Sequence, residues 1–228
     1  MKKIVLSLAL LGSFTFGVAD VGREAISKCD QGDAASCKVA GLLYFTGVTR
    51  EIDNDKAFNY FKKGCDGDDK EACSYLGQMY LEGKGTKQDA QKAVEAVDKS
   101  CRNGHGLACT NLGIFYLGGI GVKKDVIKGA AYLRKACDKD DWHGCAKFAM
   151  HLDIAKDTER AKEFYKKACD LGKKDPLISL ADPENFKTYE GGASKAQIEA
   201  MKKDLIALIP PGNLELFNSA CERYDILK

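Results

Sequence analysis

The sequence predicts an all-α protein: a solenoid of paired helices that disulfides hold together and C-terminal helices cap. Three observations predict this class. Cysteine pairs eight residues apart recur along the chain, and their first members lie 36 residues apart. Glycine and tyrosine residues recur in the same register, which is typical of a repeat protein. The chain also opens with a segment typical of exported proteins, in which cysteines are usually paired.

The first residues have the pattern of a signal peptide. Lys2 and Lys3 supply positive charge, residues 4–16 form an apolar run, and small residues end at Ala19. An N-terminal transmembrane anchor is the alternative, but the run is shorter than the roughly 20 apolar residues that a span needs. We therefore expect cleavage after Ala19, with residues 1–19 removed and the mature protein periplasmic or secreted.

The ten cysteines are an even number and are expected to be bonded in an oxidising compartment. Zinc binding is the alternative, but zinc sites usually place thiols two to four residues apart or add clustered histidines. Here the spacing is eight and the three histidines are scattered, so we expect no metal and no cofactor. The spacing predicts four bridges, Cys29–Cys37, Cys65–Cys73, Cys101–Cys109 and Cys137–Cys145.

Each 36-residue unit is expected to form two antiparallel helices. In the second unit the first helix is predicted over about Ala72 to Leu81, followed by a break at Gly83 and Gly85. Asp89 is a natural N-cap for the second helix, which should end near the cysteine at 101. Each bridge then joins the end of one unit to the first turns of the next unit.

Small residues occupy one column in the middle of the predicted first helices. Gly41, Gly77 and Gly113 share this column, although glycine inside a helix costs about 1 kcal/mol relative to alanine. The recurrence predicts that neighbouring helices cross closely at these positions, because a side chain would hold their backbones apart.

The fifth unit departs from the pattern, because Cys169 has Leu177 where a partner cysteine is expected. Two helices are predicted beyond it, one capped by Ser194 and one capped by Asn213. We expect a Cys169–Cys221 bridge that ties these helices to the array; two free thiols or an intermolecular bond are the alternatives. The predicted organisation is a repeat solenoid over residues 20–174 and a capping region over residues 175–228.

The stretch "ACTNLGIFYLGGIGVKKD" followed by "AAYLRKACD" resembles Sel1-like repeats, which are related to tetratricopeptide repeats. With its cysteines, the chain resembles the Helicobacter cysteine-rich, or Hcp β-lactamase, family over roughly Lys28 to Lys173. The resemblance implies a right-handed solenoid with a groove for extended peptides, gripped by asparagines two residues after the second cysteine of each pair. Those positions here hold Val39, Tyr75, Asn111 and Lys147, so only Asn111 matches.

Two functions follow from these patterns. The repeat architecture favours a module that binds a peptide, a protein or a cell-wall fragment in its groove. The resemblance alone implies the alternative, a penicillin-binding protein with weak β-lactamase activity. No serine is followed three residues later by lysine, as serine β-lactamases require, and the catalytic residues stay unknown. The net charge of +2 favours neither nucleic acid nor an anionic membrane as partner.

The candidate groove residues are those that the first helices of the units would present. Each could also be an ordinary solvated residue. They are Lys38, Tyr75, Gln78, Asn111, Lys147 and His151.

The fourth cysteine pair encloses one tryptophan and one histidine. Trp142 is predicted to lie in a turn, either as an anchor for a partner or packed on neighbouring residues. His143 and His151 are expected to be separated by a turn, so a metal shared between them is not predicted.

Overall fold

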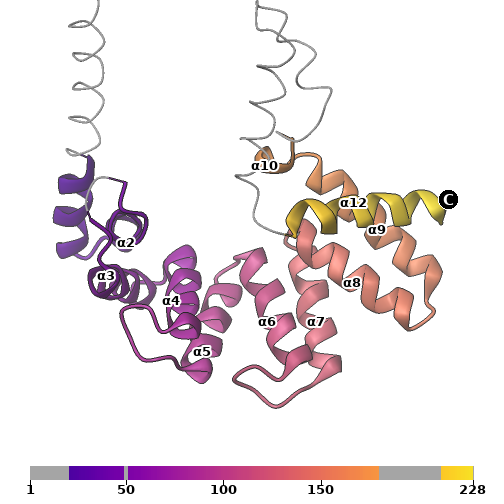
Figure 1. Cartoon of the computed structure of the whole chain (residues 1–228), viewed down its shortest axis with the longest axis horizontal. Helices are drawn as coiled ribbons and strands as arrows, with labels where there is room; N and C mark the ends of the chain where they lie inside the picture. Colours follow the sequence, from indigo (N-terminus) through magenta and orange to yellow (C-terminus); the bar gives the residue numbers. More distant parts are fainter. Residues whose placement is uncertain (1–20, 49–50, 180–211, 228) are drawn as a thin grey trace, which may run out of the picture. The chain divides into compact units, whose positions relative to one another are not determined.

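A computed structural model of the 228-residue chain describes residues 21–48, 51–179 and 212–227 (Figure 1). The described residues contain helices and no strand. They belong to two compact units, Met1–Asp125 and Val126–Lys228. The expected signal peptide and the helix predicted after Ser194 lie outside the described residues.

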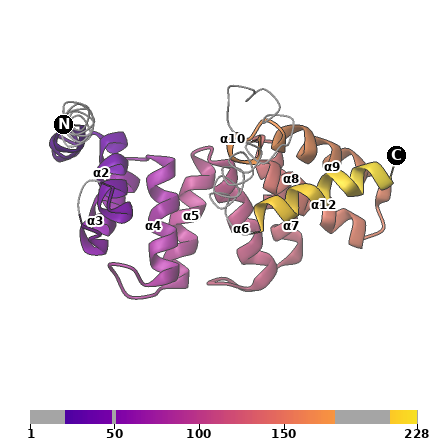
Figure 2. The same cartoon turned by 45° about the horizontal axis from the view of Figure 1, so that its top comes forward.

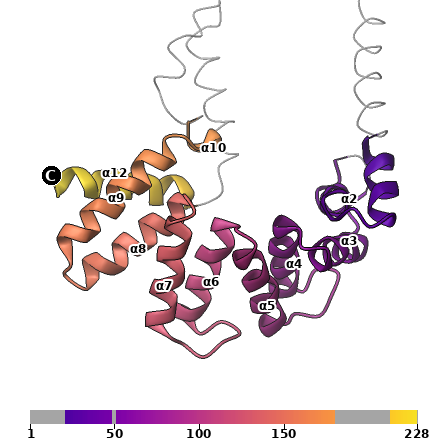
Figure 3. The same cartoon turned by 180° about the vertical axis from the view of Figure 1, so that it is seen from behind.

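The first unit is a stack of alternating first and second repeat helices (Figure 3). Each helix packs against the next one along the chain. After a helical segment at residues 21–30 come α2 (Ala34–Thr46), α3 (Asn54–Asp66), α4 (Lys70–Glu82), α5 (Ala90–Arg102) and α6 (Gly106–Gly118).

The second unit continues the alternation and ends in a cap. Helix α12 packs against α8 and α9 (Figure 2). The helices of this unit are α7 (Val126–Cys137), α8 (Trp142–Ile154), α9 (Thr158–Gly172), the short α10 (Pro176–Ser179) and α12 (Asn213–Ile226). The predicted class, an α/α solenoid with disulfides between repeats and a helical cap, is confirmed.

The predicted helix boundaries of the second repeat are close to the observed ones. Asp89 caps α5, and its side chain accepts a hydrogen bond from the Lys92 backbone N–H at 3.0 Å. Gly83 and Gly85 have φ values of 68° and 64°, in the left-handed region that glycine adopts without strain. A Cβ at position 85 would lie 2.1 Å from the Asn54 carbonyl oxygen, so glycine also permits close contact with the preceding repeat.

The glycine column lies where two helices of one repeat cross. A Cβ at Gly77 would lie 2.5 Å from Cγ2 of Val97 and 3.2 Å from the Ala93 carbonyl oxygen. A Cβ at Gly41 would lie 2.6 Å from the Phe61 ring. The prediction of close helix crossing is therefore confirmed at these two positions.

All ten cysteines are bonded, and none is free. The four predicted eight-residue bridges each join the end of a second helix to the first turn of the next first helix. Cys169 and Cys221 form the fifth bridge, across a sequence separation of 52. This bridge links α9 to α12 and holds the cap on the last repeat.

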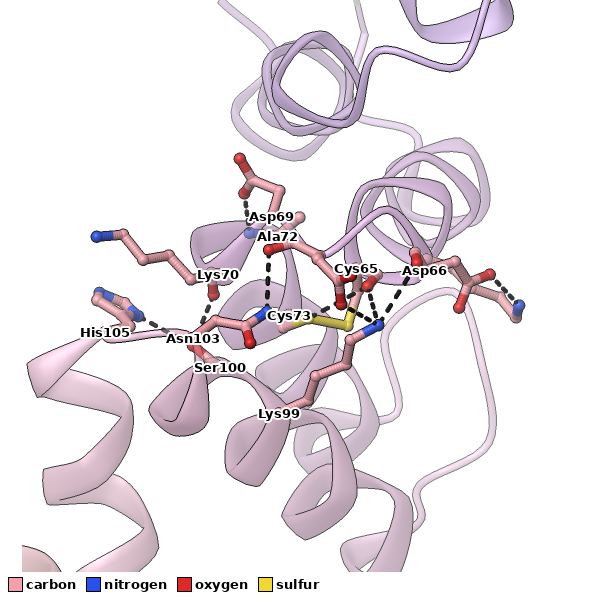
Figure 4. The surroundings of a disulfide bond; sticks show 12 residues. Cys65, Asp66, Asp69, Lys70, Ala72, Cys73, Lys99, Ser100, Asn103 and His105 are labelled. Atoms are coloured by element: carbon pink, nitrogen blue, oxygen red, sulfur yellow. Dashed lines mark hydrogen bonds and ion pairs between the residues drawn. A yellow bond between two sulfur atoms is a disulfide. The ribbon is translucent and has the colours of Figure 1, made fainter.

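A lysine from the following repeat binds the turn inside a bridge. Lys99 on α5 donates a hydrogen bond to the Cys65 carbonyl oxygen at 2.6 Å and pairs with Asp68 at 3.0 Å (Figure 4). Lys167 on α9 binds the Cys137 carbonyl oxygen at 2.8 Å in the same way. These ammonium groups lie at helix C-termini, where carbonyl oxygens lack intrahelical partners and positive charge is favourable.

A buried apolar cluster and an ion pair fix the cap. Trp142 packs edge-to-face on Phe217 of α12, with ring centroids 6.0 Å apart, and its indole N–H donates to Asp175 at 3.0 Å. Arg223 of α12 forms two hydrogen bonds with Asp153 of α8, at 2.7 and 3.0 Å. The Arg223 guanidinium holds the pKa of the Asp153 carboxyl below its ordinary value.

Three local predictions are wrong. Trp142 is the first residue of α8 and not part of a turn, and its contacts are internal. His143 and His151 both lie on α8, because that helix begins before position 143. Helix α12 is capped by Gly212, with φ of 82°, and Asn213 is already helical. Glycine suits this position because it tolerates the left-handed conformation.

The described residues hold neither a cluster of metal ligands nor a membrane-spanning helix. No group of three or more histidine, cysteine, aspartate or glutamate residues could hold a metal ion among them. None of the helices in residues 21–48, 51–179 and 212–227 has the length and apolar character of a membrane span.

Candidate ligand groove

A groove of about 340 Å³ lies in the first unit between α4 and α6, and we call it the α4–α6 groove. Helix α5 contributes one residue to it, and the turn before α6 contributes another. The lining residues are Glu71, Ser74, Tyr75, Gln78, Leu81, Val97, His105, Leu107, Asn111 and Phe115.

Helical periodicity places these side chains on one face of each helix. On α6 the lining positions Leu107, Asn111 and Phe115 are four residues apart, so they follow one another along a single stripe. On α4 the lining residues recur every three or four positions from Glu71 to Leu81, with Ser74 and Tyr75 adjacent. The other faces of α4 hold the buried residues that pack on neighbouring helices.

The floor of the groove is apolar and firmly packed. Val97 and Phe115 are buried, whereas Leu107 is 40% exposed and accessible to a ligand. The Tyr75 ring stacks on Phe61, with centroids 4.9 Å apart, and also contacts Phe45. A side chain that is held from below in this way presents a preorganised surface.

Polar groups line the edges of the groove. The half-buried Asn111 lies in the middle of the α6 stripe, where its amide offers both donors and an acceptor. Gln78 on α4 donates a hydrogen bond to Glu82 at 2.8 Å. Glu71 lies near the start of α4, with Lys38 of α2 at 3.7 Å from its carboxylate. Lys38 also lies 3.8 Å from Asp69, which caps α4.

Ser100 and His105 form a hydrogen-bonded pair beside the groove, at 3.2 Å (Figure 4). Ser100 is fully buried, and its hydroxyl donates its one proton to the Lys70 carbonyl oxygen at 2.6 Å. His105 Nδ1 must therefore donate to the serine oxygen, which fixes the tautomer of the imidazole. A nucleophilic serine needs the opposite direction, with its proton given to the histidine. The pair instead joins the start of α6 to α4 and α5.

The groove unites three of the six predicted site residues, Tyr75, Gln78 and Asn111. Lys38 does not line it but reaches its edge through Glu71. The two remaining residues, Lys147 and His151, lie on α8 in the second unit and do not line the groove. Binding by any of these residues stays a prediction.

Most of the lining was not singled out from the sequence. Leu107 and Phe115 lie four residues before and after Asn111, so helical spacing would have found them. Val97 and His105 lie on a second helix and in a turn, and only the packing of consecutive repeats brings them to the groove.

Comparison with known proteins establishes the family. A sequence profile described as Sel1 repeat matches residues 34–69, 70–105, 106–141 and 151–173, which is more than half of the chain. The chain belongs to the Sel1 repeat family. The predicted resemblance to Sel1-like repeats is thus confirmed, and α4 and α6 are the first helices of the second and third matched repeats. No curated protein sequence matches the chain significantly.

Two similar solved structures, those with a TM-score above 0.5, show the same Sel1 repeat fold. A Sel1 repeat protein of Oxalobacter formigenes is 20% identical, with a TM-score of 0.63 over 90% of this chain and 76% of that chain. A protective antigen of uropathogenic Escherichia coli is also 20% identical, with a TM-score of 0.59 over 86% and 46%. Helicobacter pylori cysteine-rich protein B is 24% identical, with a TM-score of 0.46 over 57% and 94%.

Proposed function

We propose that the chain is an exported, disulfide-stapled Sel1 repeat scaffold that binds an extended peptide segment of another protein in the α4–α6 groove. The observation that carries the proposal is the groove itself, with a packed apolar floor and side-chain amides at its edges. The N-terminal sequence pattern and the complete pairing of ten cysteines support export.

The dimensions of the groove suit a short peptide. Its lining on α4 runs from Glu71 to Leu81, which corresponds to about 15 Å at the helical rise of about 1.5 Å per residue. An extended peptide covers that length with about four or five residues. Apolar ligand side chains would contact Leu107 and the buried floor, while Asn111 would bond to the ligand backbone.

Hydrolysis of β-lactams remains the alternative that the family resemblance implies. Within the described residues, the structure adds no observation that favours it. The serine–histidine pair beside the groove has its hydrogen bond in the wrong direction for a nucleophile and its base.

The experiment that tests the proposal is selection of a randomised, C-terminally amidated heptapeptide library on the oxidised mature protein. Affinities of selected peptides are then measured by fluorescence anisotropy. We expect Asn111→Ala to weaken binding about tenfold, the effect of about 1.4 kcal/mol of lost hydrogen bonding. Leu107→Ser should also weaken binding, through lost apolar contact.

A matched control is Ile127→Ser on α7, which changes an isoleucine that is 84% exposed and outside the groove. Its affinity should equal that of the wild type. Selected peptides that bind all three variants as tightly as the wild type would contradict a site in the α4–α6 groove.

A further inference from the structure

We propose that the α4–α6 groove selects peptides carrying a basic residue a few positions from an apolar one, and discriminates against ligands that present a carboxylate. This inference rests on the proposed function and names its ligand class. Two features of the first unit carry it: the location of a single carboxylate in a largely apolar lining, and the charges around that carboxylate.

The one carboxylate of the lining lies at one end of the groove, whereas apolar side chains line its whole length. Helix α5 runs back between α4 and α6, so these two helices run in the same direction. Their first turns supply Glu71 and Ser74 from α4 and the apolar Leu107 from α6, with His105 just before α6. Their later turns supply Leu81 and Phe115, above the buried Val97. A bound peptide would meet the Glu71 carboxylate at one end and apolar side chains along the groove.

Glu71 is the one acidic group in the lining, and the lining contains no lysine or arginine. Three charged neighbours lie near it. Lys38 and Lys70 lie 3.7 and 3.9 Å from its carboxylate, and Asp69 lies 3.8 Å from the same Lys38. The ion pairs of Glu71 are longer than hydrogen bonds and partly exposed, so they contribute little. A ligand ammonium can therefore pair with Glu71 at closer range.

A ligand carboxylate meets no lysine or arginine in the lining, and the cations nearest to Glu71, Lys38 and Lys70, already pair with the Glu71 carboxylate. The ligand carboxylate would lose part of its hydration beside Glu71, and both desolvation and like charge oppose this. β-Lactams and cell-wall peptides that end in a free carboxylate belong to this disfavoured class. A neutral amidated peptide should bind with an intermediate affinity.

Lysines of the first unit other than Lys38 and Lys70 line a second hollow. This more open hollow on α3, α4 and α5 has a volume of about 320 Å³ and is lined by Lys62, Lys92 and Lys99, with Asp66 and Glu95. Each of these lysines already pairs with a carboxylate, Lys62 with Asp66, Lys92 with Asp89 and Lys99 with Asp68. We therefore assign no ligand class to this hollow.

The test repeats the library selection on the wild type, on Glu71→Gln and on Glu95→Gln. Glu95 is an exposed carboxylate on α5 outside the groove, so its variant removes the same charge at a matched position. On the wild type and Glu95→Gln we expect lysine or arginine to be enriched near a leucine or phenylalanine. Glu71→Gln should keep the apolar preference and lose the basic one.

Titration of the best wild-type peptide and of its Lys→Glu analogue completes the test. The wild type should bind the lysine form at least several-fold more tightly, and Glu71→Gln should bind the two forms nearly equally. This inference is overturned if the enriched peptides show no preference for a basic residue, or if Glu71→Gln keeps that preference. Either result leaves the proposal of peptide binding intact. A penicillin that displaces the peptide competitively also overturns this inference. Selection that enriches no peptide at all overturns the proposed function itself.

Discussion

At the scale of single residues, Gly77 permits the contact between α4 and α5. A Cβ there would lie 2.5 Å from Val97, so we expect Gly77→Ala to destabilise the protein by about 1–3 kcal/mol through overpacking. Gly118→Ala is the control, because a Cβ at the end of α6 would have its nearest neighbour at 3.4 Å. Chemical unfolding of both variants measures the difference, and equal stabilities would refute the close-crossing argument.

The Asp153–Arg223 pair gives stability a defined pH dependence. Because the pKa of Asp153 is lowered in the folded state, its contribution is complete above the ordinary carboxyl pKa of about 4 and is lost as pH falls through the lowered pKa. Arg223→Gln should lower the stability only slightly at pH 7, because solvent screens a partly exposed pair.

This cost should disappear in acid. Unfolding free energies of wild type and variant, measured from pH 7 to pH 2, should converge at the low end. Arg134→Gln, at an exposed position on α7, serves as the control and should show no such convergence. A constant difference for Arg223→Gln across the whole range would contradict the ionic account.

Residue-level features were predictable wherever they recur. The Asp89 cap and the glycines at 77, 83 and 85 follow from the columns of the repeat. The α12 cap was misassigned because that helix occurs once, and both Gly212 and Asn213 are residues that helix caps accept. The serine–histidine pair could not be predicted from the sequence, because one residue lies near a helix end and the other lies in a turn.

At the scale of secondary-structure elements, the docking of α12 can be followed by fluorescence. Trp142 is the single tryptophan of the chain, is 4% exposed, and packs on Phe217. We expect Phe217→Ala to open this cluster to water and shift the emission to longer wavelength. Phe217→Leu, which keeps an apolar side chain, should shift it less. An unchanged spectrum for Phe217→Ala would show that α12 does not cover the indole.

Lys99 binds the turn that a disulfide bridge closes, and this contact should stabilise the junction between two repeats. Lys99→Met removes the bonds to the Cys65 carbonyl oxygen and to Asp68 but keeps an apolar chain of similar length. We expect a loss of about 1–2 kcal/mol in unfolding free energy. Lys87→Met, in the exposed loop after α4, is the control and should be near neutral. An unchanged unfolding free energy for Lys99→Met would contradict this stabilising role.

The four short disulfide bridges were predictable from the cysteine spacing, because a short turn brings residues eight positions apart together. The lysine contacts were not predictable. The lysine lies 34 residues after its cysteine in one case and 30 in the other, because the repeats differ in length. Lysine is also common on every helix surface, so its column carries little information before the fold is known.

At the scale of the whole molecule, the bridges supply much of the stability. In the chain-entropy account, closing a loop of about nine residues contributes roughly 2.5 kcal/mol, and the longer Cys169–Cys221 loop roughly 4 kcal/mol. Five such terms reach the usual stability of a domain, about 5–15 kcal/mol. Strong reductant should therefore unfold the protein or lower its melting temperature by tens of degrees. An equal concentration of the oxidised reagent is the control. An unchanged melting temperature in the reductant would contradict the claim that the bridges stabilise the fold.

The repeat period predicted the solenoid, its helix pairs and its family, because each unit repeats one local pattern. The groove was only half predicted. Tyr75 and Asn111 share one repeat position and meet in the structure, whereas Lys147 occupies the same position in the second unit, outside the groove. Its floor depends on how α4, α5 and α6 pack, which no single repeat specifies.

The central claim is that the α4–α6 groove is the ligand site of this scaffold. Hydrogen–deuterium exchange of the oxidised protein, with and without a peptide selected on it, tests the claim most directly. The account predicts new protection on α4 and α6 around the groove, and none on α12. Protection confined to α12 or to the lysine-lined hollow would contradict it.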